Sequence, residues 1–555
     1  MTALLAWLDR PRPDRGVHFA TAGGGWDFWP YPRLAALVRH SAGALAGAGV
    51  RRGDTVTIVE PTGPAFVGLL FGAMLTGATP SPVAPAPAFG DRDRYAGHLA
   101  ALLRASAPAL VVHGGPGSAR VGELAAAAGV SDVDSGTLLG APEAVVATGP
   151  AAVAGPAGTG AVPDPAGIAL LQFTSGTTGR VRGVRVPYRA LAANVAAIQC
   201  WLEMTPADPT ASWLPVHHDM GLVGCLLAPV VTGGDLWLMS PGDFARRPLE
   251  YLRCFGQRGA RLTAMPAFGL DHIVRRVSPA ALSTMDFAGW RAVIVGAERV
   301  APRSLARFVA LCGPRGLSRQ ALLPAYGLAE ATLAVTGLPL RTGWTQAAPP
   351  GGVPVVGCGP PLPGVRVRIA DPAGASVPDG RTGEIVVGGD GLAAGYLPVP
   401  GAGEPAGPPG AEVRTGDAGF LYRGQLHVIG RLGDAVKVRG RSVYAEDLDA
   451  AVLAGCDAPA GRVATLLGTV AGHPRAVLVL ERPEPAWLAA AVAAARATEA
   501  TLAVEPLCVP VGSIPRTSSG KPRRRELWQA YLDGRLAGTA RPDPAGADAG
   551  AGAGR

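Results

Sequence analysis

Short apolar strands and amphipathic helices alternate along the first third of the chain. A helical pattern over 34–50 leads through the polar turn RRGD into the strand TVTIV at 55–59, and another helix is predicted over 65–76. The unit recurs as a helix at 95–105 and a strand at 109–113. Further along the chain we predict strands at 168–173, 235–239, 261–265 and 292–295 and a helix at 189–200. Helices of this length between short apolar strands are typical of a parallel sheet that helices cover on both faces. The alternation therefore predicts an α/β fold.

The pattern changes near residue 357. Short β segments follow, separated by DG and TG turns, and they indicate a β-rich subdomain that runs to about residue 429. Beyond 430–434 we predict a strand at 435–440 and a helix at 446–454. A second set of elements follows: a strand at 476–481, a helix at 485–497 and a strand at 507–509. We therefore expect an N-terminal domain (1–430), a C-terminal α+β domain (431–540) and a disordered, low-complexity tail (541–555).

Charge and cysteine content exclude several classes of protein. The 50 basic and 42 acidic residues leave a net charge of +8 without a basic tract that carries interleaved aromatics, which argues against a nucleic-acid partner. The most apolar stretches are short or broken by Gly and Pro, so we expect no membrane span. Seven scattered cysteines without a CxxC pair, and an N-terminus unlike a secretory signal, predict a reduced, cytoplasmic protein.

Lysine occurs at two positions, Lys437 and Lys521, and every other basic residue is arginine. A compact ammonium fits between two anionic oxygens, where a wide planar guanidinium displaces one of them. In a chain so biased towards arginine, both lysines are candidates for chemistry that arginine cannot perform.

Three motifs suggest a nucleotide site. The segment QFTSGTTGRVRGV (172–184) is a strand that enters a loop of hydroxyls and glycines, which is a cradle for phosphate oxygens, although an ordinary glycine-rich loop has the same texture. In PAYGLAEATL (324–333) a strand enters a predicted helix whose first acid either holds Mg²⁺ or satisfies the helix dipole. In RTGDAGFL (414–421) Asp417 either binds two ribose hydroxyls or belongs to a simple hairpin turn.

Two further motifs contain the lysines. In GRLGDAVKVRGRSVYAEDLD (430–449) the cations Lys437, Arg439 and Arg441 alternate, which predicts one face of a single strand. The alternative is a solvated edge strand protected by charge. In IPRTSSGKPRRREL (514–527) a flexible loop presents Lys521, and the alternative is an exposed helix start.

In this order, over residues 27–536, the five motifs make the chain similar to the adenylate-forming (acyl-activating, AMP-binding) superfamily. SWLPVHHDMGLVG (212–224) resembles a characteristic segment of the fatty acyl-AMP ligases, the branch that the chain resembles most. The resemblance implies a large N-terminal domain, with parallel sheets covered by helices plus a β-rich subdomain, hinged to the small C-terminal domain. It also implies that a fatty or related carboxylic acid and ATP give an acyl-adenylate and pyrophosphate, with Mg²⁺, before a thiol takes the acyl group.

The resemblance also implies roles for individual residues. Lys521, Glu330, His218 and Lys437 would be catalytic, with Glu330 as the Mg²⁺ ligand and Lys437 used in the second step. His218 would stand where the acyl carboxylate meets the adenylate, beside an apolar acyl pocket at 213–229 and 265–270. The nucleotide would be bound by Thr174, Ser175, Gly176, Thr177, Thr178, Gly179, Gly296, Ala297, Glu298, Tyr326, Asp417 and Arg431.

Departures from the branch leave the thiol acceptor open. The hinge position is Gly433, and the segment 337–356, which restrains the C-terminal domain in acyl-AMP ligases, looks shortened. Lys437 occupies a place where thioester-forming relatives have a lysine. We expect the acceptor to be the phosphopantetheine thiol of an acyl carrier protein, or of a carrier domain of a polyketide or peptide synthetase, with CoA as the alternative. An inactive adenylate-binding protein is disfavoured, because Glu330, Asp417 and Lys521 are all present.

Overall fold

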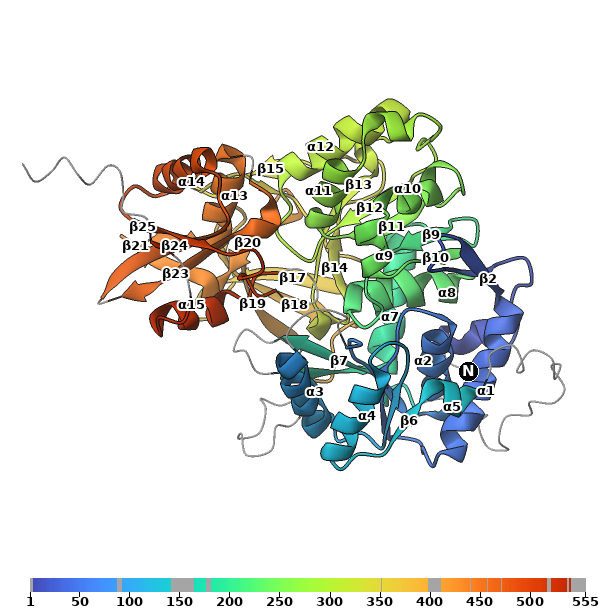
Figure 1. Ribbon diagram of the computed structural model, residues 1–555. Coiled ribbons are helices and arrows are strands. Elements are labelled where there is room, and N and C mark those ends of the chain that lie inside the picture. The colour runs from blue at the N-terminus through green and yellow to red at the C-terminus, as the bar shows by residue number, and fades with distance from the viewer. Residues whose placement is uncertain are drawn as a thin grey trace, which may run out of the picture.

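The computed structural model describes residues 3–86, 92–140, 164–175, 181–350, 352–397, 411–439, 441–456, 458–470, 472–516, 521–536 and 539–540. The predicted tail, 541–555, lies outside the described residues. Figure 1 shows the larger body, coloured blue to yellow, beside a smaller body formed by the orange and red end of the chain.

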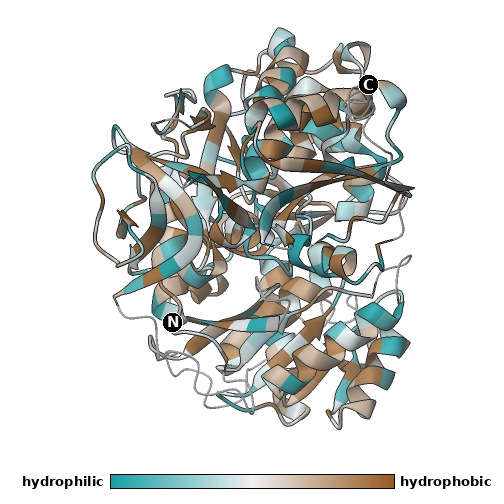
Figure 2. Ribbon diagram, turned by 90° about the vertical axis from the view of Figure 1, so that its left-hand side faces the viewer, coloured by the Kyte–Doolittle hydropathy of each residue, from teal (hydrophilic) through white to brown (hydrophobic). Residues whose placement is uncertain are grey.

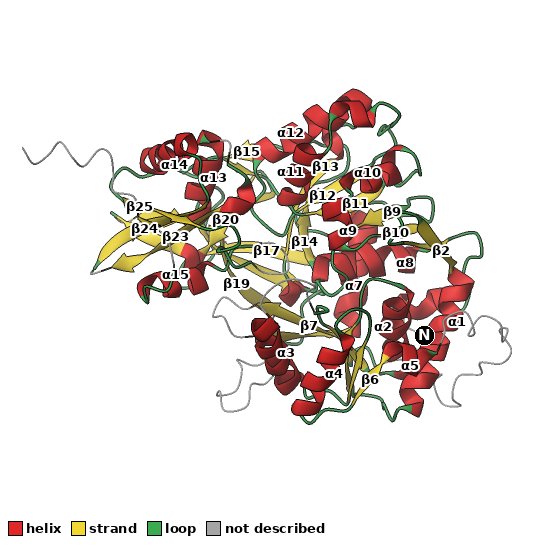
Figure 3. Cartoon of the chain, in the orientation of Figure 1, coloured by secondary structure: helices red, strands yellow, loops and turns green. Residues whose placement is uncertain are grey.

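An eight-stranded sheet with a parallel centre forms the middle of the larger body (Figures 1 and 3). Its strands follow the order β14 (Ala334–Gly337), β13 (Leu322–Gly327), β12 (Ala292–Val295), β11 (Leu262–Met265), β9 (Thr210–Ser212), β10 (Leu236–Leu238), β1 (Gly16–Ala20) and β2 (Trp26–Pro30). Its helices include α7 (Tyr188–Trp201), α8 (Ala228–Thr232), α9 (Pro241–Arg246), α10 (Pro248–Gly256), α11 (Ala267–Arg276) and α12 (Pro302–Cys312). The α/β prediction is confirmed here, and the strands predicted at 235–239, 261–265 and 292–295 are present.

A second, four-stranded parallel sheet has helices on both faces. Its order is β4 (Thr79–Pro82), β3 (Thr55–Val59), β5 (Leu110–His113) and β6 (Asp132–Asp134). The helices of this part are α1 (Tyr31–Gly47), α2 (Pro64–Thr76), α3 (Arg92–Ser106), α4 (Ser118–Ala127) and α5 (Ser135–Leu139). Helices α1 and α2 belong to the main hydrophobic core, whereas α3 and α4 pack in a separate cluster around Val59 and Val111. One pair of helices therefore covers each face of this sheet, as the alternation predicts.

The described ends of the phosphate-loop motif belong to two paired strands. Strand β7 (Ile168–Ser175) pairs antiparallel with β8 (Val181–Pro187), and α7 begins directly after β8. The sequence predicts β7 and α7 but not β8, whose glycine and arginines resemble a loop.

The helix predicted after PAYG is absent, and the prediction was wrong. Strand β13 ends at Gly327, a single 3-10 turn spans Ala329–Ala331, and β14 returns antiparallel to β13. The backbone N–H of Leu328 donates to the carbonyl of Leu333, which closes this hairpin. A Cβ at Gly327 would lie 1.9 Å from that carbonyl oxygen, so the close approach requires glycine.

The β-rich subdomain is a four-stranded antiparallel sheet of β17 (Val365–Ala370), β18 (Gly383–Gly389), β19 (Glu412–Tyr422) and β20 (Gln425–Arg431). The shortened segment 337–356 contains a small hairpin, β15 (Gln346–Ala347) with β16 (Val355–Val356). The carbonyl of Leu426 in β20 accepts a hydrogen bond from the backbone N–H of Cys358, which ties the chain after this segment to the sheet.

The smaller body has its own hydrophobic clusters. Strands β23 (Val463–Val470), β24 (His473–Glu481), β25 (Ala503–Val509) and β26 (Thr539–Ala540) form one sheet, with α13 (Ala445–Gly455), α14 (Pro485–Thr498) and α15 (Arg524–Leu532). One cluster includes Val452, Leu478 and Ala491, and a second includes Leu466 and Leu527. Figure 2 shows mixed brown and teal segments along these elements, as expected for half-buried helices and strands. The boundary at 430 remains a prediction.

The strand predicted at 435–440 ends early. Strand β21 (Ala435–Val438) turns at Arg439, which has a φ of 48°, and returns as β22 (Arg441–Tyr444). Lys437 lies opposite Ser442, and Val438 lies opposite Arg441. Because directly opposed residues share a face, Lys437 and Arg441 lie on opposite faces, and the predicted row of three cations was wrong.

Candidate active site

A cavity of about 1450 Å³ lies between the two bodies and brings most of the predicted site residues together. Its lining includes Thr174, His218, Gly296, Ala297, Glu298, Tyr326, Glu330, Asp417, Arg431, Gly433 and Lys521. Gly176, Thr177, Thr178 and Gly179 lie outside the described residues, as does the side chain of Ser175. Residues from motifs up to about 350 positions apart in the sequence thus face one space.

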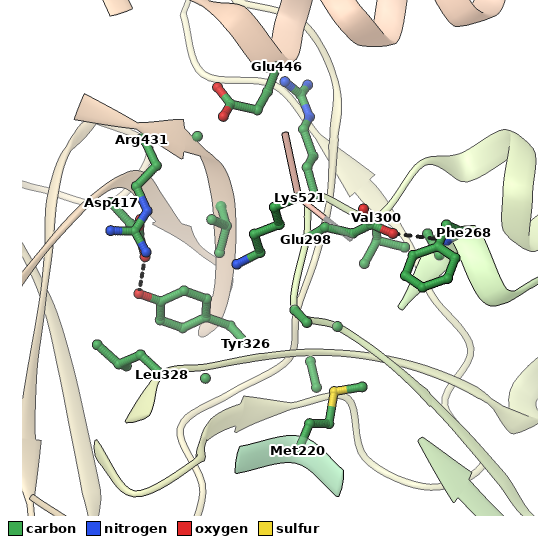
Figure 4. A pocket seen from close by; sticks show the side chains of 18 of the residues that line it. Met220, Phe268, Glu298, Val300, Tyr326, Leu328, Asp417, Arg431, Glu446 and Lys521 are labelled. Carbon is green, nitrogen blue, oxygen red and sulfur yellow. Dashed lines mark hydrogen bonds and ion pairs between the residues drawn. The ribbon is translucent and has the colours of Figure 1, made fainter. Parts of the chain in front are cut away.

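Asp417 of β19 is held from two sides in this cavity (Figure 4). The phenol of Tyr326 donates a 2.6 Å hydrogen bond to Oδ2, and Nε of Arg431 lies 2.7 Å from Oδ1. Burial and then the Asp417 charge raise the pKa of Tyr326, so the phenol remains a donor. The carboxylate is therefore fixed in place while it faces the cavity.

Lys521 reaches into the space between this cluster and Glu298 (Figure 4). Burial, and then the charge of Arg431, lower the pKa of its ammonium group, while Asp417, Asp219 and Glu298 oppose that shift. A cation in this position is poised to gain an anionic ligand, because such a ligand would offset the burial of the ammonium.

The two adjacent histidines lie in different environments. His218 Nδ1 is 2.6 Å from Oδ1 of Asp219; burial opposes the charged imidazole, but this ion pair outweighs it and raises the pKa of His218. Burial lowers the pKa of His217 to about 4, so that ring is neutral at pH 7. Gln172 Nε2 donates to the carbonyl of His217, which joins this segment to β7. His218 is thus the polar, oriented member of the pair.

Glu330 sits on the 3-10 turn between β13 and β14. Its Oε1 accepts a 2.6 Å hydrogen bond from the phenol of Tyr396, and the guanidinium of Arg182 lies 5.3 Å from the centre of the Tyr396 ring. Among the described residues no three His, Cys, Asp or Glu side chains form a cluster that would hold a metal ion by themselves. One carboxylate in an open cavity nevertheless suits Mg²⁺, which keeps several waters and commonly takes one or two protein carboxylates plus phosphate oxygens.

The segment after β12 forms one wall of the cavity. Ala297 has a φ of 65°, and Oε1 of Glu298 accepts a hydrogen bond from the backbone N–H of Phe268 at 2.9 Å (Figure 4). Burial raises the pKa of Glu298, and the Phe268 N–H opposes that shift. The Glu298 carboxylate therefore holds α11 against this segment, in addition to lining the cavity.

The remaining two predicted residues differ, because Gly433 lines the cavity and Lys437 does not. The side chain of Lys437 is exposed on β21 and is absent from the cavity lining. Gly433 lies in the 3-10 turn Leu432–Asp434, where a Cβ would come 2.6 Å from the guanidinium of Arg525. The structure thus places Lys521 in the cavity and Lys437 outside it.

Sequence reasoning missed two side chains that organise this site. Asp219, which orients His218, lies within the recognised HHDMG segment but received no role there. Tyr396, which holds Glu330, is 66 residues further along the chain, and no local pattern marks it. In the part of the chain that the structure describes, no helix is long and apolar enough to cross a membrane.

Comparisons with known proteins agree with this geometry. The family model described as AMP-binding enzyme matches residues 8–397. The chain is 31% identical to the long-chain-fatty-acid–AMP ligase FadD26 of Mycobacterium marinum, over 86% of this chain and 87% of that protein. It is 29% identical to the 4-hydroxyphenylalkanoate adenylyltransferase of Mycobacterium tuberculosis, over 91% of this chain and 86% of that protein.

Among solved structures, one from a study of fatty acyl-adenylate ligases from E. coli and L. pneumophila superimposes with a TM-score of 0.84 at 27% identity, covering 96% of this chain and 98% of that one. The family matched covers well over half of the chain, and the fold matched covers nearly all of it. The chain therefore belongs to the AMP-binding enzyme family.

Proposed function

We propose that this chain is a fatty acyl-AMP ligase that passes its acyl group to a carrier-bound thiol. In the first step a carboxylate oxygen of the acid attacks the α-phosphorus of ATP, the bond to the bridging oxygen breaks, and pyrophosphate leaves. In the second step a thiol sulfur attacks the acyl carbonyl, AMP leaves and the thiol proton is lost. The observation that carries the proposal is the convergence of Lys521, Asp417 and Glu330 on one cavity.

Lys521 would act in the first step by contacting both the acid's carboxylate and the α-phosphate. These two anionic groups repel one another, and an ammonium between them offsets that repulsion most strongly when charge builds up in the transition state. The burial that lowers the pKa of Lys521 also strengthens this interaction, because fewer waters compete for the charges.

The nucleotide would lie against β13 and β19. Asp417, fixed by Tyr326 and Arg431, presents its carboxylate to ribose hydroxyls, while Gly296 and Ala297 leave room for the adenine. Thr174 and the loop that follows it would receive the phosphates, because Thr174 at the end of β7 and Arg182 in β8 both line the cavity.

Glu330 would hold Mg²⁺, with Tyr396 fixing the carboxylate through Oε1. When bound, the ion supplies positive charge that offsets the charge of the leaving pyrophosphate. His218, oriented by Asp219, would stand beside the reacting carboxylate and donate a hydrogen bond to it.

The FadD26 relative, named as a long-chain-fatty-acid–AMP ligase, supports a fatty acid as the acid that is activated. For the second step we propose that the part beyond residue 430 rotates at Gly433, so that Lys521 leaves and the β21 strand with Lys437 approaches. The exposed position of Lys437 outside the cavity is consistent with a role in an arrangement other than this one.

The experiment offers purified protein a fatty acid, ATP and Mg²⁺, with either CoA or a holo-acyl carrier protein. Pyrophosphate release with acyl transfer to the carrier supports the proposal. Rapid formation of acyl-CoA would overturn the carrier as the acceptor, and absence of acid-dependent pyrophosphate release would overturn the activity itself.

One observation favours the second candidate, an acyl-CoA ligase. The segment 337–356 would have to restrain the C-terminal part in order to disfavour CoA. Its described residues after β14 form one small hairpin of two-residue strands. Both this small hairpin and the presence of Lys437 favour CoA as the alternative acceptor, so CoA is the acceptor to compare directly with the carrier.

A further inference from the structure

The cavity lining includes a group of apolar residues from α7, the π-helix that follows His218, and the segment around β14. They are Ile198, Trp201, Leu202, Gly224, Leu333 and Ala334, and we call the part of the cavity that they line the apolar arm. The π-helix Met220–Leu227 begins two residues after His218, and the backbone N–H of Leu222 donates to the His218 carbonyl. A Cβ at Gly224 of this helix would lie 3.1 Å from Leu333, so the arm is narrow at that point.

Helix α7 forms the long side of the apolar arm. Near its middle, Asn194 Nδ2 donates to the carbonyls of Ala331 and Ala334, which places this turn of the helix beside the segment that carries Glu330. Trp201 is the last residue of α7, seven positions further along. At a rise of 1.5 Å per residue, Trp201 lies about 10 Å along the helix from Asn194.

Trp201 is held in place by two contacts. Its Nε1 donates a 2.8 Å hydrogen bond to the carbonyl of Leu338. Its ring packs closely against Gly337, where a Cβ would come 2.2 Å from the ring. The glycine admits the indole and the hydrogen bond fixes its direction, so the ring is a rigid wall rather than a movable side chain.

We propose that Trp201 closes the apolar arm and so limits the length of the acyl chain that the cavity accepts. The ring lines the cavity and is fixed by its hydrogen bond and by its packing on Gly337, so an acyl chain that reaches the ring cannot push it aside. This inference rests on the proposed function, because the arm holds an acyl chain only if the cavity activates a fatty acid. It goes further by naming the residue that selects among fatty acids.

The test measures ATP–pyrophosphate exchange with hexanoic, octanoic, decanoic, lauric and palmitic acids for wild type and for Trp201→Ala. We expect wild-type kcat/KM to peak at an acid shorter than palmitic acid. In Trp201→Ala the peak should move to a longer acid, with a gain of about fourfold for each further methylene that becomes buried. Trp201→Leu keeps a smaller apolar side chain at this position and should shift the peak less. It replaces the alanine variant in the test if Trp201→Ala does not fold.

Trp26→Ala is the matched control, because Trp26 is also half-buried but does not line the cavity. It should leave the order of acids unchanged. An active Trp201→Ala or Trp201→Leu enzyme with the wild-type order of acids, or a wild-type enzyme that prefers palmitic acid, would overturn the inference alone. A wild-type enzyme that exchanges pyrophosphate with none of the acids would overturn the proposed function and the inference with it.

Discussion

The guanidinium of Arg299 forms an ion pair with the carboxylate of Asp447, and their side chains are 13% and 16% exposed. Arg299 belongs to the cavity wall after β12, and Asp447 belongs to the first turn of α13, so the pair joins the larger body to the smaller one. Arg299 also donates to the carbonyl of Ile429, just before the proposed hinge. This contact therefore favours the arrangement in which Lys521 occupies the cavity.

Arg299→Ala should slow adenylate formation more than thiol transfer. Loss of a mostly buried ion pair leaves Asp447 without this partner and makes the observed arrangement less populated, by an expected tenfold or so. Pyrophosphate release measures the first step, and transfer from pre-formed acyl-adenylate to a thiol measures the second. Equal loss in both steps would indicate a general fold defect, and Arg341→Ala, at the exposed pair with Glu203, is the control.

The two lysines provide a matched pair of variants. Lys521→Arg should lower adenylate formation by about 10²–10³-fold, the usual cost of removing one positioned transition-state donor, because the guanidinium displaces one of the two anions. Lys437→Arg should leave pyrophosphate release unchanged, because Lys437 lies outside the cavity. Near-normal pyrophosphate release by Lys521→Arg would remove Lys521 from the first step.

Tyr396→Phe should weaken the use of Mg²⁺. The variant keeps the ring beside Arg182 but loses the hydrogen bond to Oε1 of Glu330, so the carboxylate is no longer fixed. Changes to the groups that orient a metal ligand typically cost about 10- to 100-fold in metal affinity. A titration of activity against Mg²⁺ should therefore move to higher concentration, and an unchanged titration would separate Tyr396 from any metal role.

The stability of the larger body should depend on the protonation of Glu60. This residue follows β3 and is 9% exposed. Burial raises the pKa of its carboxyl group to about 7. A hydrogen bond from Ser135 and the charge of His113 oppose this shift, whereas the charge of Asp134 adds to it. The folded state therefore binds a proton more tightly than the unfolded state, whose pKa is near 4.5. Stability is highest below about pH 4.5, falls as the pH rises to about 7, and is then constant with respect to this group.

Glu60→Gln removes that dependence while keeping the shape of the side chain. Relative to wild type it should be more stable at about pH 8, by up to about 3 kcal/mol, and the gain should vanish near about pH 4.5. Thermal melting of both proteins at the two pH values measures the difference. Glu123→Gln, at an exposed position paired with Arg120, is the control for loss of a charge. A Glu60→Gln protein less stable than wild type at high pH would contradict the assigned direction.

Much of the fold follows from the sequence because strand–helix alternation is a local pattern. The central strands β10, β11 and β12 and helix α14 were predicted within a few residues, since each is a short apolar run between turn residues. The family, too, was predicted from motifs that are contiguous in the chain, such as QFTSGTTG and YGLAEATL. Composition and periodicity were sufficient to predict those elements whose conformation is determined by their own residues.

The errors arose where distant or backbone contacts decide the structure. YGLAEATL has the apolar texture of a helix, yet Gly327 permits a backbone contact that makes the segment a hairpin. Arg439 adopts a positive φ that turns the chain back, so the alternating cations divide between two strands. Tyr396 and Asp219 acquire their roles through hydrogen bonds and ion pairs, which hydrophobic periodicity does not encode.

The double hold on Asp417 has a thermodynamic consequence. Arg431 is the last residue of β20, two positions before Gly433, and it shares the Asp417 carboxylate with Tyr326. Ribose hydroxyls that donate hydrogen bonds to this carboxylate must compete with Arg431. Nucleotide binding and the conformation of the 431–434 segment are therefore coupled in free energy. Such coupling is reciprocal. If one position of the smaller body strengthens nucleotide binding, nucleotide binding stabilises that position by the same free energy. Through this one aspartate, the conformation of the 431–434 segment would depend on whether the site holds ATP, adenylate or AMP.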